Sequence, residues 1–313
     1  MNFELISPCP IPYALCPMNT NLDNPFQKLK VRYLFGQFVL ISFGIGLIQG
    51  LLQGASGQQF NSQTSILVLY ILIFCSLSLW TLADFQRTGV NFQYLMGTVP
   101  KNYKWLSTLG LVLLMILFSI SAYLVSFSLL SWVAPNFIKA LLNQVANNPA
   151  PRSSAPLFYN LLGAIAYVVI APITEEFIFR GFILQRWAAK WGLGSALVVS
   201  SILFGVLHAN FVGLSLFGLV MGVLYIKTRS LIVPIVCHAL NNLIASGMGF
   251  LSSSAEPTTT SAANTLEQLR SGWWVGVLLM SVSLPLLLRF LIRNWPRKDA
   301  LVPYLINAST TQR

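Results

Sequence analysis

Residues 33–83 read YLFGQFVLISFGIGLIQGLLQGASGQQFNSQTSILVLYILIFCSLSLWTLA and contain no Asp, Glu, Lys or Arg. A second uncharged stretch runs from Trp105 to Ile138. A helix needs about 20 consecutive apolar residues to cross the hydrocarbon core of a bilayer. The first stretch is long enough for two such helices and the second for one. These stretches predict a protein that crosses the membrane several times.

The composition of the whole chain also favours a membrane protein over a soluble one. Of the 313 residues, 55% are apolar and 9% are charged, and the mean hydropathy is +0.70. In a soluble domain roughly a quarter of the residues are charged. The net charge of +11 would suggest a nucleic-acid partner in a soluble protein. Here the basic residues flank apolar stretches, so we expect the lipid bilayer, and no nucleic acid, as a partner.

The apolar stretches predict an all-α fold, a multi-pass transmembrane bundle of about eight helices with an intramembrane polar cavity. The fourth helix is expected to continue past Glu175. The expected helices are 33–53, 64–83, 105–133, 156–174, 192–208, 212–227, 231–249 and 272–292. The chain then divides into an N-terminal cytoplasmic segment (1–32), accessory helices (33–133), a core (156–249), a mobile outer loop (250–271) and the last helix with a basic tail (272–313).

The distribution of basic residues predicts the orientation of these helices. With the N-terminus inside, the outer loops hold Lys139, Arg152 and Arg270, and the rest of the 19 Lys and Arg residues lie in the inner segments. Because cytoplasmic loops are enriched in Lys and Arg, both termini are expected in the cytoplasm. Residues 1–27 lack a basic region followed by an apolar stretch, so no cleaved signal peptide is expected. In a bacterial host the membrane would be the plasma (cell) membrane.

Few ionisable residues lie at membrane depth, and they fall in three places that contain both histidines of the chain. Such residues are costly in lipid and usually face a bundle interior or a water-filled cavity. In each place, two polar or aromatic residues are four apart and so share one face of a helix. The three pairs are Glu176 with Arg180, Phe204 with His208, and His238 with Asn242.

Each of these pairs has a purely structural interpretation as well. Glu176 and Arg180 can form an ion pair that supports a helix end, and an intramembrane His or Asn often makes an interhelical hydrogen bond. The adjacent carboxylates of Glu175 and Glu176 are harder to explain in this way. Neighbours on a helix point about 100° apart, so one arginine cannot easily neutralise both. The second carboxylate, near two imidazoles, is a candidate acid–base group.

Taken in order, these residues resemble the three motifs of the CPBP family, which comprises the type II CAAX prenyl proteases and the bacterial abortive-infection and bacteriocin-processing proteins. The family pattern E-E-x-x-F-R-G is matched by residues 175–181. The turn at 227–231, followed by Pro234 and His238, is similar to the third family block. The resemblance covers about residues 155–249, under a third of the chain, and marks this core as CPBP-like.

What the resemblance implies is an intramembrane glutamic endopeptidase that hydrolyses a peptide bond with an activated water and needs no cofactor or metal. Glu175 and His208 would activate the water, while His238 and Asn242 would bind the oxyanion. Glu176, Arg180 and Phe204 would support the site. The implied substrate is a membrane-embedded or lipid-modified peptide or protein, with a prenylated CAAX-type protein as one candidate.

Two alternatives to this function remain. Glu175, His208 and His238 could serve as the ligands of a zinc-dependent membrane protease, although the motif His-Glu-x-x-His is absent. The polar residues could instead stabilise a non-catalytic membrane scaffold or chaperone. The depth of His208 is a further difficulty, since it lies roughly 27 Å along a straight helix from Lys190. The helix 192–208 must therefore tilt steeply or begin well inside the membrane.

Overall fold

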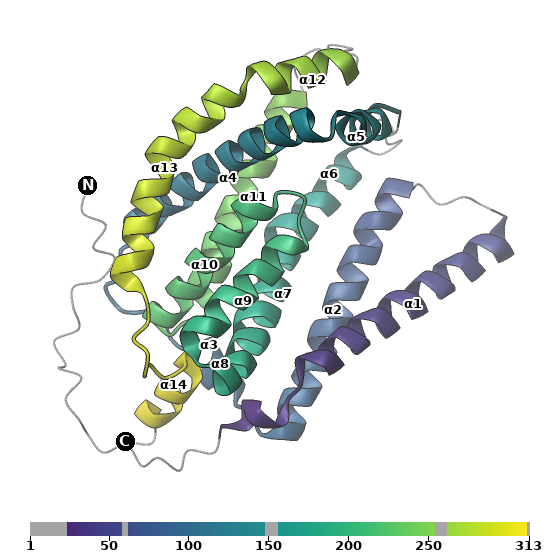
Figure 1. The fold of residues 1–313 in the computed structure, drawn as a ribbon. Coiled ribbons are helices and arrows are strands. Elements are labelled where there is room, and N and C mark those ends of the chain that lie inside the picture. Colours follow the sequence, from purple (N-terminus) through teal and green to yellow (C-terminus); the bar gives the residue numbers. More distant parts are fainter. Residues whose placement is uncertain (1–23, 58–61, 148–155, 254–261, 312–313) are drawn as a thin grey trace.

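A computed structural model describes residues 24–57, 62–147, 156–253 and 262–311 and shows an all-helical chain (Figure 1). No strand occurs in these ranges, so the predicted all-α class is confirmed. The predicted segment 1–32 falls outside the described residues as far as residue 23. Seven apolar helices of this part of the chain are α1 (Val31–Ser56), α2 (Ser62–Thr88), α4 (Trp105–Val133), α9 (Leu193–Val206), α10 (Phe211–Thr228), α11 (Ile232–Ser253) and α13 (Trp273–Asn294).

Six of the described helices are long and apolar enough to cross a membrane, and two shorter apolar helices, Leu193–Val206 and Ile232–Met248, accompany them. The protein is an integral membrane protein. All eight predicted apolar helices have counterparts in the structure. The shorter helix α9 has 14 residues and is therefore about 21 Å long, less than the roughly 30 Å of a hydrocarbon core.

The fourth apolar segment is one continuous helical rod from Leu157 to Trp191 whose backbone changes geometry along its length. Two π-helical segments flank the short helix α7. The elements are α6 (Pro156–Ala164), π-helix η2 (Ile165–Ile170), α7 (Ala171–Glu176), π-helix η3 (Phe177–Leu184) and α8 (Gln185–Trp191). Wide π turns are rare and often lie at functional sites. Glu175 and Glu176 lie between the two.

Pro172 explains the first of these π-helical segments. Proline has no N–H, and its ring crowds the carbonyl four residues earlier, here that of Val168. The N–H of Ala171 accordingly donates to the carbonyl of Ala166, five residues back. The widened turn thus follows from a proline placed two residues after the segment.

The centre of the bundle is the antiparallel pair α9 and α10, which pack side by side (Figure 1). Glycines allow this close approach. A Cβ on Gly218 would lie 3.1 Å from Cα of Ser201, and one on Gly205 would lie 2.6 Å from the carbonyl oxygen of Phe211. Small residues of this kind let membrane helices approach closely. The rod packs against α9 through η3 and α8.

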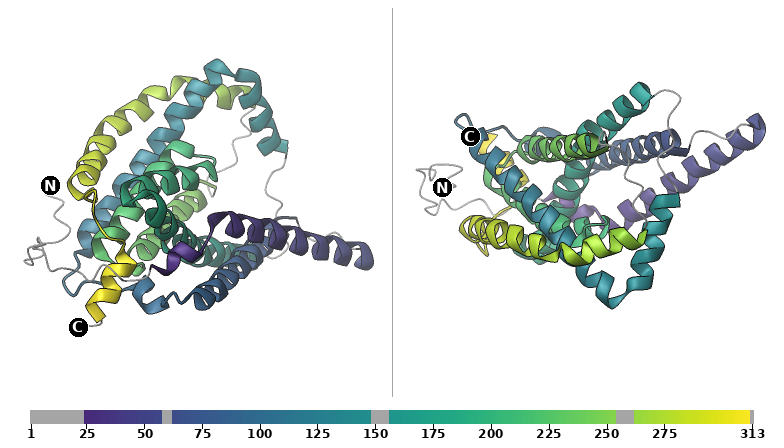
Figure 2. Two further views of the ribbon diagram at one scale, coloured as in Figure 1. Left: turned by 60° about the horizontal axis from the view of Figure 1, so that its bottom comes forward. Right: turned by 90° about the horizontal axis from the view of Figure 1, so that it is seen from above.

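The two ends of the described chain lie together. The 3₁₀-helix η1 (Pro25–Lys28), α3 (Phe92–Met96) and α14 (Pro303–Thr311) gather at one end of the bundle (Figure 2). The rings of Phe26 and Tyr304 pack edge to face, with their centroids 5.1 Å apart. The side-chain amide of Asn307 donates to the carbonyls of Tyr94 and Arg229. Both described ends are therefore on one side, as the predicted orientation requires; the cytoplasmic assignment stays a prediction.

Two connections differ from the expected loops. The stretch after α4 contains α5 (Pro135–Asn147), and the predicted mobile outer loop 250–271 is helical at both ends, as the last residues of α11 and as α12 (Ala262–Ser271). Helix α12 packs on α4: Arg270 Nη2 donates to the Ser131 carbonyl at 2.6 Å, and Ser128 Oγ donates to the Leu269 carbonyl at 2.5 Å. Polar composition suggested a loop, but these side chains hold a helix. Residues 254–261 lie outside the described residues.

Candidate active site

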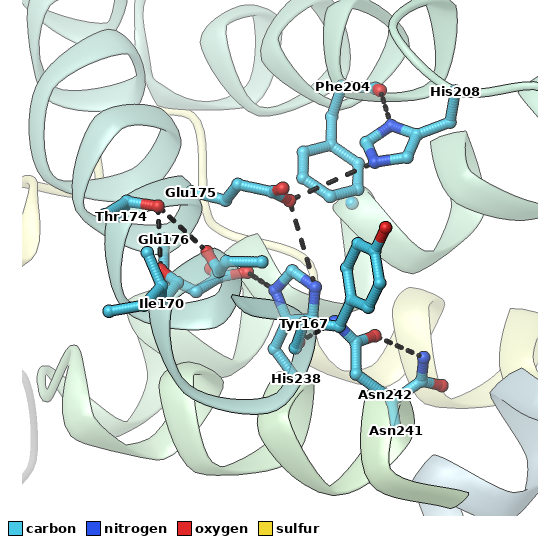
Figure 3. Close-up of polar contacts among 12 residues, drawn as sticks. Tyr167, Ile170, Thr174, Glu175, Glu176, Phe204, His208, His238, Asn241 and Asn242 are labelled. Atoms are coloured by element: carbon cyan, nitrogen blue, oxygen red, sulfur yellow. Dashed lines mark hydrogen bonds and ion pairs between the residues drawn. The ribbon is translucent and has the colours of Figure 1, made fainter. Parts of the chain in front are cut away.

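Three separate elements bring Glu175 and the two histidines together (Figure 3). Glu175 lies on α7, His208 follows the end of α9, and His238 lies on α11. Glu175 Oε2 is 4.0 Å from His208 Nε2 and 3.9 Å from His238 Nε2. Both imidazoles therefore present the same ring nitrogen to one carboxylate oxygen.

The orientation of His208 is fixed by its own helix. Its Nδ1 lies 2.7 Å from the carbonyl oxygen of Phe204. Because a carbonyl oxygen only accepts hydrogen bonds, Nδ1 carries the proton. In the neutral ring Nε2 is then the unprotonated nitrogen, and it faces Glu175. A base and a carboxylate 4.0 Å apart leave room for a water that bonds to both at about 2.8 Å.

Glu176 is the centre of a second, fully buried group. Its Oε1 accepts from Arg180 Nη1 at 3.0 Å, and the two side chains are 0% and 4% exposed. This ion pair is the one that the four-residue spacing predicted. The same oxygen lies 2.9 Å from His238 Nδ1, a link between α7 and α11 that the sequence analysis missed. His238 thus connects the two glutamates.

Phe204 and a second hydrogen bond of Arg180 also hold the buried guanidinium in place. Arg180 Nη2 donates to the Gly218 carbonyl at 2.9 Å, and its guanidinium lies 4.9 Å from the centroid of the Phe204 ring. The Phe204 ring, itself 0% exposed, also contacts the rings of His208 and His238. A buried arginine thereby has a carboxylate, a carbonyl and an aromatic face as partners.

Tyr70 on α2 is a site residue that the sequence analysis did not identify. Its hydroxyl donates to Glu175 Oε1 at 2.9 Å, so it holds the carboxylate oxygen that does not face the histidines. Its ring packs 4.6 Å from that of Phe74. A tyrosine in an apolar run 105 residues away carries no local signal of this contact. An accessory helix therefore supplies one wall of the site.

Asn242 makes a contact that was not expected. Its Nδ2 donates to the carbonyl of Tyr167 at 2.9 Å (Figure 3). In a π-helix this carbonyl would accept from the residue five positions later, but that residue is Pro172, which has no N–H. The N–H of Ala171 is already bonded to Ala166. Asn242 thus satisfies a carbonyl that the proline leaves open.

The cluster opens to the surface on the His208 side. The side chain of His208 is 34% exposed, whereas those of Glu175 and His238 are 11% and 4% exposed. The position of His208 along its helix raised the question of whether it could reach Glu175. Helix α9 is short and starts after a turn at Gly192 with φ of 83°, and the imidazole of His208 does lie beside Glu175. Within the described ranges, no group of three or more His, Cys, Asp or Glu has a spacing that could hold a metal ion.

Comparisons with known proteins agree with the motifs. Residues 157–244 match the family model "Type II CAAX prenyl endopeptidase Rce1-like". The chain is 30% identical to human CAAX prenyl protease 2 over 210 residues, which is 60% of each chain. It is 35% identical over 77 residues to a Bacillus subtilis (strain 168) protein named as a membrane peptidase, YdiL, covering 24% of this chain and 32% of that one.

The rat CAAX prenyl protease 2 is 36% identical over 84 residues, 26% of each chain. The chain spans less than two thirds of the length of each of these relatives. No solved structure matches it significantly. The matched family segment contains every candidate residue named from the sequence, from Glu175 to Asn242, and leaves out Tyr70.

Proposed function

We propose that this chain, whose residues 157–244 match the Rce1-like type II CAAX prenyl endopeptidase family model, is a CPBP-type intramembrane endopeptidase that cleaves by a glutamate-activated water. The observation that carries the proposal is the position of Glu175 Oε2, 4.0 and 3.9 Å from the Nε2 atoms of two histidines. A carboxylate beside two imidazoles can move protons at a water molecule without a covalent intermediate. Residues 156–249 are proposed as the functional core. Tyr70, from an accessory helix, contributes a hydrogen bond to Glu175.

The first chemical step would use Glu175 and His208. A water between Oε2 and His208 Nε2 gives its proton to this pair while its oxygen attacks the carbonyl carbon of the peptide. Tyr70 donates to the other carboxylate oxygen and so keeps Oε2 directed at the water. A general base of this kind contributes typically 10²–10⁴-fold in rate.

The second step concerns the charge that develops on the carbonyl oxygen. His238 is proposed to donate to this oxyanion from Nε2 while its Nδ1–H donates to Glu176 Oε1, an arrangement that requires the imidazolium form. Asn242 is proposed to act beside it. When the intermediate collapses, the C–N bond breaks and the proton held by Glu175 passes to the leaving amine. Glu176 and Arg180 hold the geometry.

The proposed substrate is a membrane-embedded or lipid-modified peptide or protein. The human relative is named CAAX prenyl protease 2, which makes a prenylated C-terminal peptide the first substrate to test. The exposed side of His208 gives such a chain a route to Glu175 from the edge of the bundle. Both termini are proposed to lie in the cytoplasm, and the membrane to be the plasma membrane in a bacterial host.

The proposal can be tested with purified protein in lipid nanodiscs and two peptides of one sequence, farnesylated or unmodified at the cysteine. Cleavage by the wild type but not by Glu175→Gln supports the endopeptidase. A matched control is Glu267→Gln, because Glu267 lies on α12 outside the site. Equal cleavage by wild type and Glu175→Gln refutes it. Cleavage of both peptides alike removes the requirement for the prenyl group.

The zinc-protease alternative uses the same three side chains, since two imidazole nitrogens and a carboxylate oxygen are a known catalytic zinc set, but among the described residues they are not placed so that they could hold a metal ion. Metal analysis of active protein separates the two mechanisms. We expect activity to survive chelation, and stoichiometric zinc whose removal abolishes activity and whose return restores it would establish the alternative. The scaffold alternative predicts instead that Glu175→Gln changes no cleavage product in the cell.

A further inference from the structure

A cavity of about 310 Å³ is lined by residues of η1, α1 and α2, none of which belongs to the candidate active site. Its inner wall is apolar and includes Leu34 and Phe182, which are 6% and 3% exposed. Its volume is at the lower end for small-molecule sites. The polar part of the lining comes from the end of η1, the turn that follows it, α1 and α2, and includes Lys28, Lys30, Gln37, Asp84 and Arg87.

The charge of this lining is predominantly positive. Three cationic side chains, Lys28, Lys30 and Arg87, surround one carboxylate, Asp84. Both oxygens of Asp84 already have partners, because Gln37 Nε2 donates to Oδ2 at 2.7 Å and Arg87 lies 3.5 Å from Oδ1. The carboxylate is thus engaged inside the wall. The lining therefore holds more cationic than anionic side chains.

Aromatic residues place the mouth of the cavity at the depth of lipid headgroups. Tyr33 and Trp80 both line it and are 57% and 37% exposed. Tyrosine and tryptophan beside lysine and arginine at the end of membrane helices are typical of the membrane–water interface. The Lys30 ammonium lies 5.4 Å from the centroid of the Tyr33 ring, which orients it near the mouth.

We propose that this cavity binds the phosphate headgroup of an anionic phospholipid. The cations would pair with the phosphate, as basic pockets between membrane helices do at an anionic leaflet. The adjoining faces of α1 and α2 are apolar and exposed, with Phe35 68% exposed on the first and Leu79 67% exposed on the second. Acyl chains attached to the bound headgroup can lie along these faces. This site does not depend on the proposed protease activity.

Native mass spectrometry of the purified full chain, titrated with phosphatidylglycerol or phosphatidylcholine, tests the assignment. The wild type is expected to retain phosphatidylglycerol at concentrations about tenfold or more below those needed for phosphatidylcholine. The variant Lys30→Gln/Arg87→Gln should lose this preference, since each basic residue near an anionic lipid strengthens binding severalfold. The matched control is Lys101→Gln/Lys298→Gln, which removes two exposed charges that do not line the cavity.

Equal binding of the two lipids by the wild type overturns the proposal, and so does an unchanged preference in the double variant. If the control variant loses the preference equally, the effect belongs to net charge and the cavity is not the site. Soluble glycerol phosphate serves as a further arm. Displacement of the lipid at micromolar concentration would identify a soluble phosphate ligand instead. Should the double variant fail to fold, Lys30→Gln alone carries the same comparison.

Discussion

Helices α1 and α10 have the same mean hydropathy in their most apolar windows, 1.8, yet they occupy opposite environments. In these windows 6% of the residues of α1 and 56% of those of α10 are buried inside the protein. A Cβ on Gly46 of α1 would meet no neighbouring atom within 4 Å, whereas a Cβ on Gly222 of α10 would lie 2.3 Å from Leu197. Hydropathy alone therefore does not distinguish a lipid-facing helix from a central one.

The polar residues make the distinction that hydropathy does not. Around the centre, buried charged groups pair with one another, as Glu176 Oε1 does with Arg180 and His238. At the periphery, Arg87 pairs with Asp84 while 75% of its side chain stays exposed. The position of the central helices is accordingly determined by contacts between particular side chains. The position of α1 depends mainly on its apolar composition, because few of its residues are buried.

The sharpest test of this contrast compares two ion pairs. Arg180→Ala leaves the buried Glu176 without its cation and should lower the free energy of unfolding by about 3–5 kcal/mol. Arg87→Ala removes a pair of similar sequence spacing at the surface and should cost about 0–1 kcal/mol. Thermal unfolding of both variants in one detergent measures the difference. Equal losses would show that burial does not distinguish the two regions.

A second contrast compares two glycines. Gly205→Ala would bring a methyl group against the carbonyl oxygen of Phe211 at 2.6 Å, and overpacking of this kind costs about 1–3 kcal/mol. Gly46→Ala meets open space and should gain up to about 1 kcal/mol through helix propensity. Opposite signs in the same unfolding assay would support the account. A destabilised Gly46→Ala would mean that α1 packs against another protein surface in the membrane.

A third prediction concerns the hydrogen bond from Asn242 to the carbonyl of Tyr167. Asn242→Ala leaves the Tyr167 carbonyl without a donor, which should cost about 1–3 kcal/mol of stability. Activity is expected to fall as well. If the melting temperature is unchanged while cleavage is lost, Asn242 serves the oxyanion alone and the contact with Tyr167 contributes nothing to the fold.

Tyr70 on α2 donates a hydrogen bond to Glu175 in the candidate active site. We expect Tyr70→Phe to change stability less than the variants above and to show its effect in the kinetics of cleavage. Loss of the hydroxyl is expected to lower kcat about tenfold with little change in KM. Tyr123→Phe on α4 is the control. An unchanged kcat would limit Tyr70 to packing.

Much of this arrangement was predictable because its signals are local. Uncharged stretches gave the positions of the membrane helices, and four-residue spacing gave the pair of Glu176 and Arg180, which the structure confirms. The ordered motifs predicted a CPBP-like core, and residues 157–244 match the Rce1-like family model. These features depend on residues within one or two helical turns of each other.

The parts that escaped prediction depend on contacts between distant segments. Tyr70 reaches Glu175 from another helix, and His238 reaches Glu176 in the same way. The π-helical turn before Pro172 arises because the N–H of Ala171 donates to the carbonyl of Ala166. This choice, which leaves the carbonyl of Tyr167 to Asn242, cannot be predicted from the sequence of the segment. The polar stretch 262–271 forms a helix because α4 offers it partners. No periodicity within a single segment encodes these choices.

Incorporation of oxygen from water into the cleavage product shows whether Glu175 activates water for peptide hydrolysis. Membranes containing the wild type or Glu175→Gln are incubated in H₂¹⁸O, and new peptide C-termini are identified by mass spectrometry. We expect ¹⁸O-labelled C-termini with the wild type and none with Glu175→Gln, whose melting temperature should remain near that of the wild type. The same labelled C-termini in both samples would contradict this expectation.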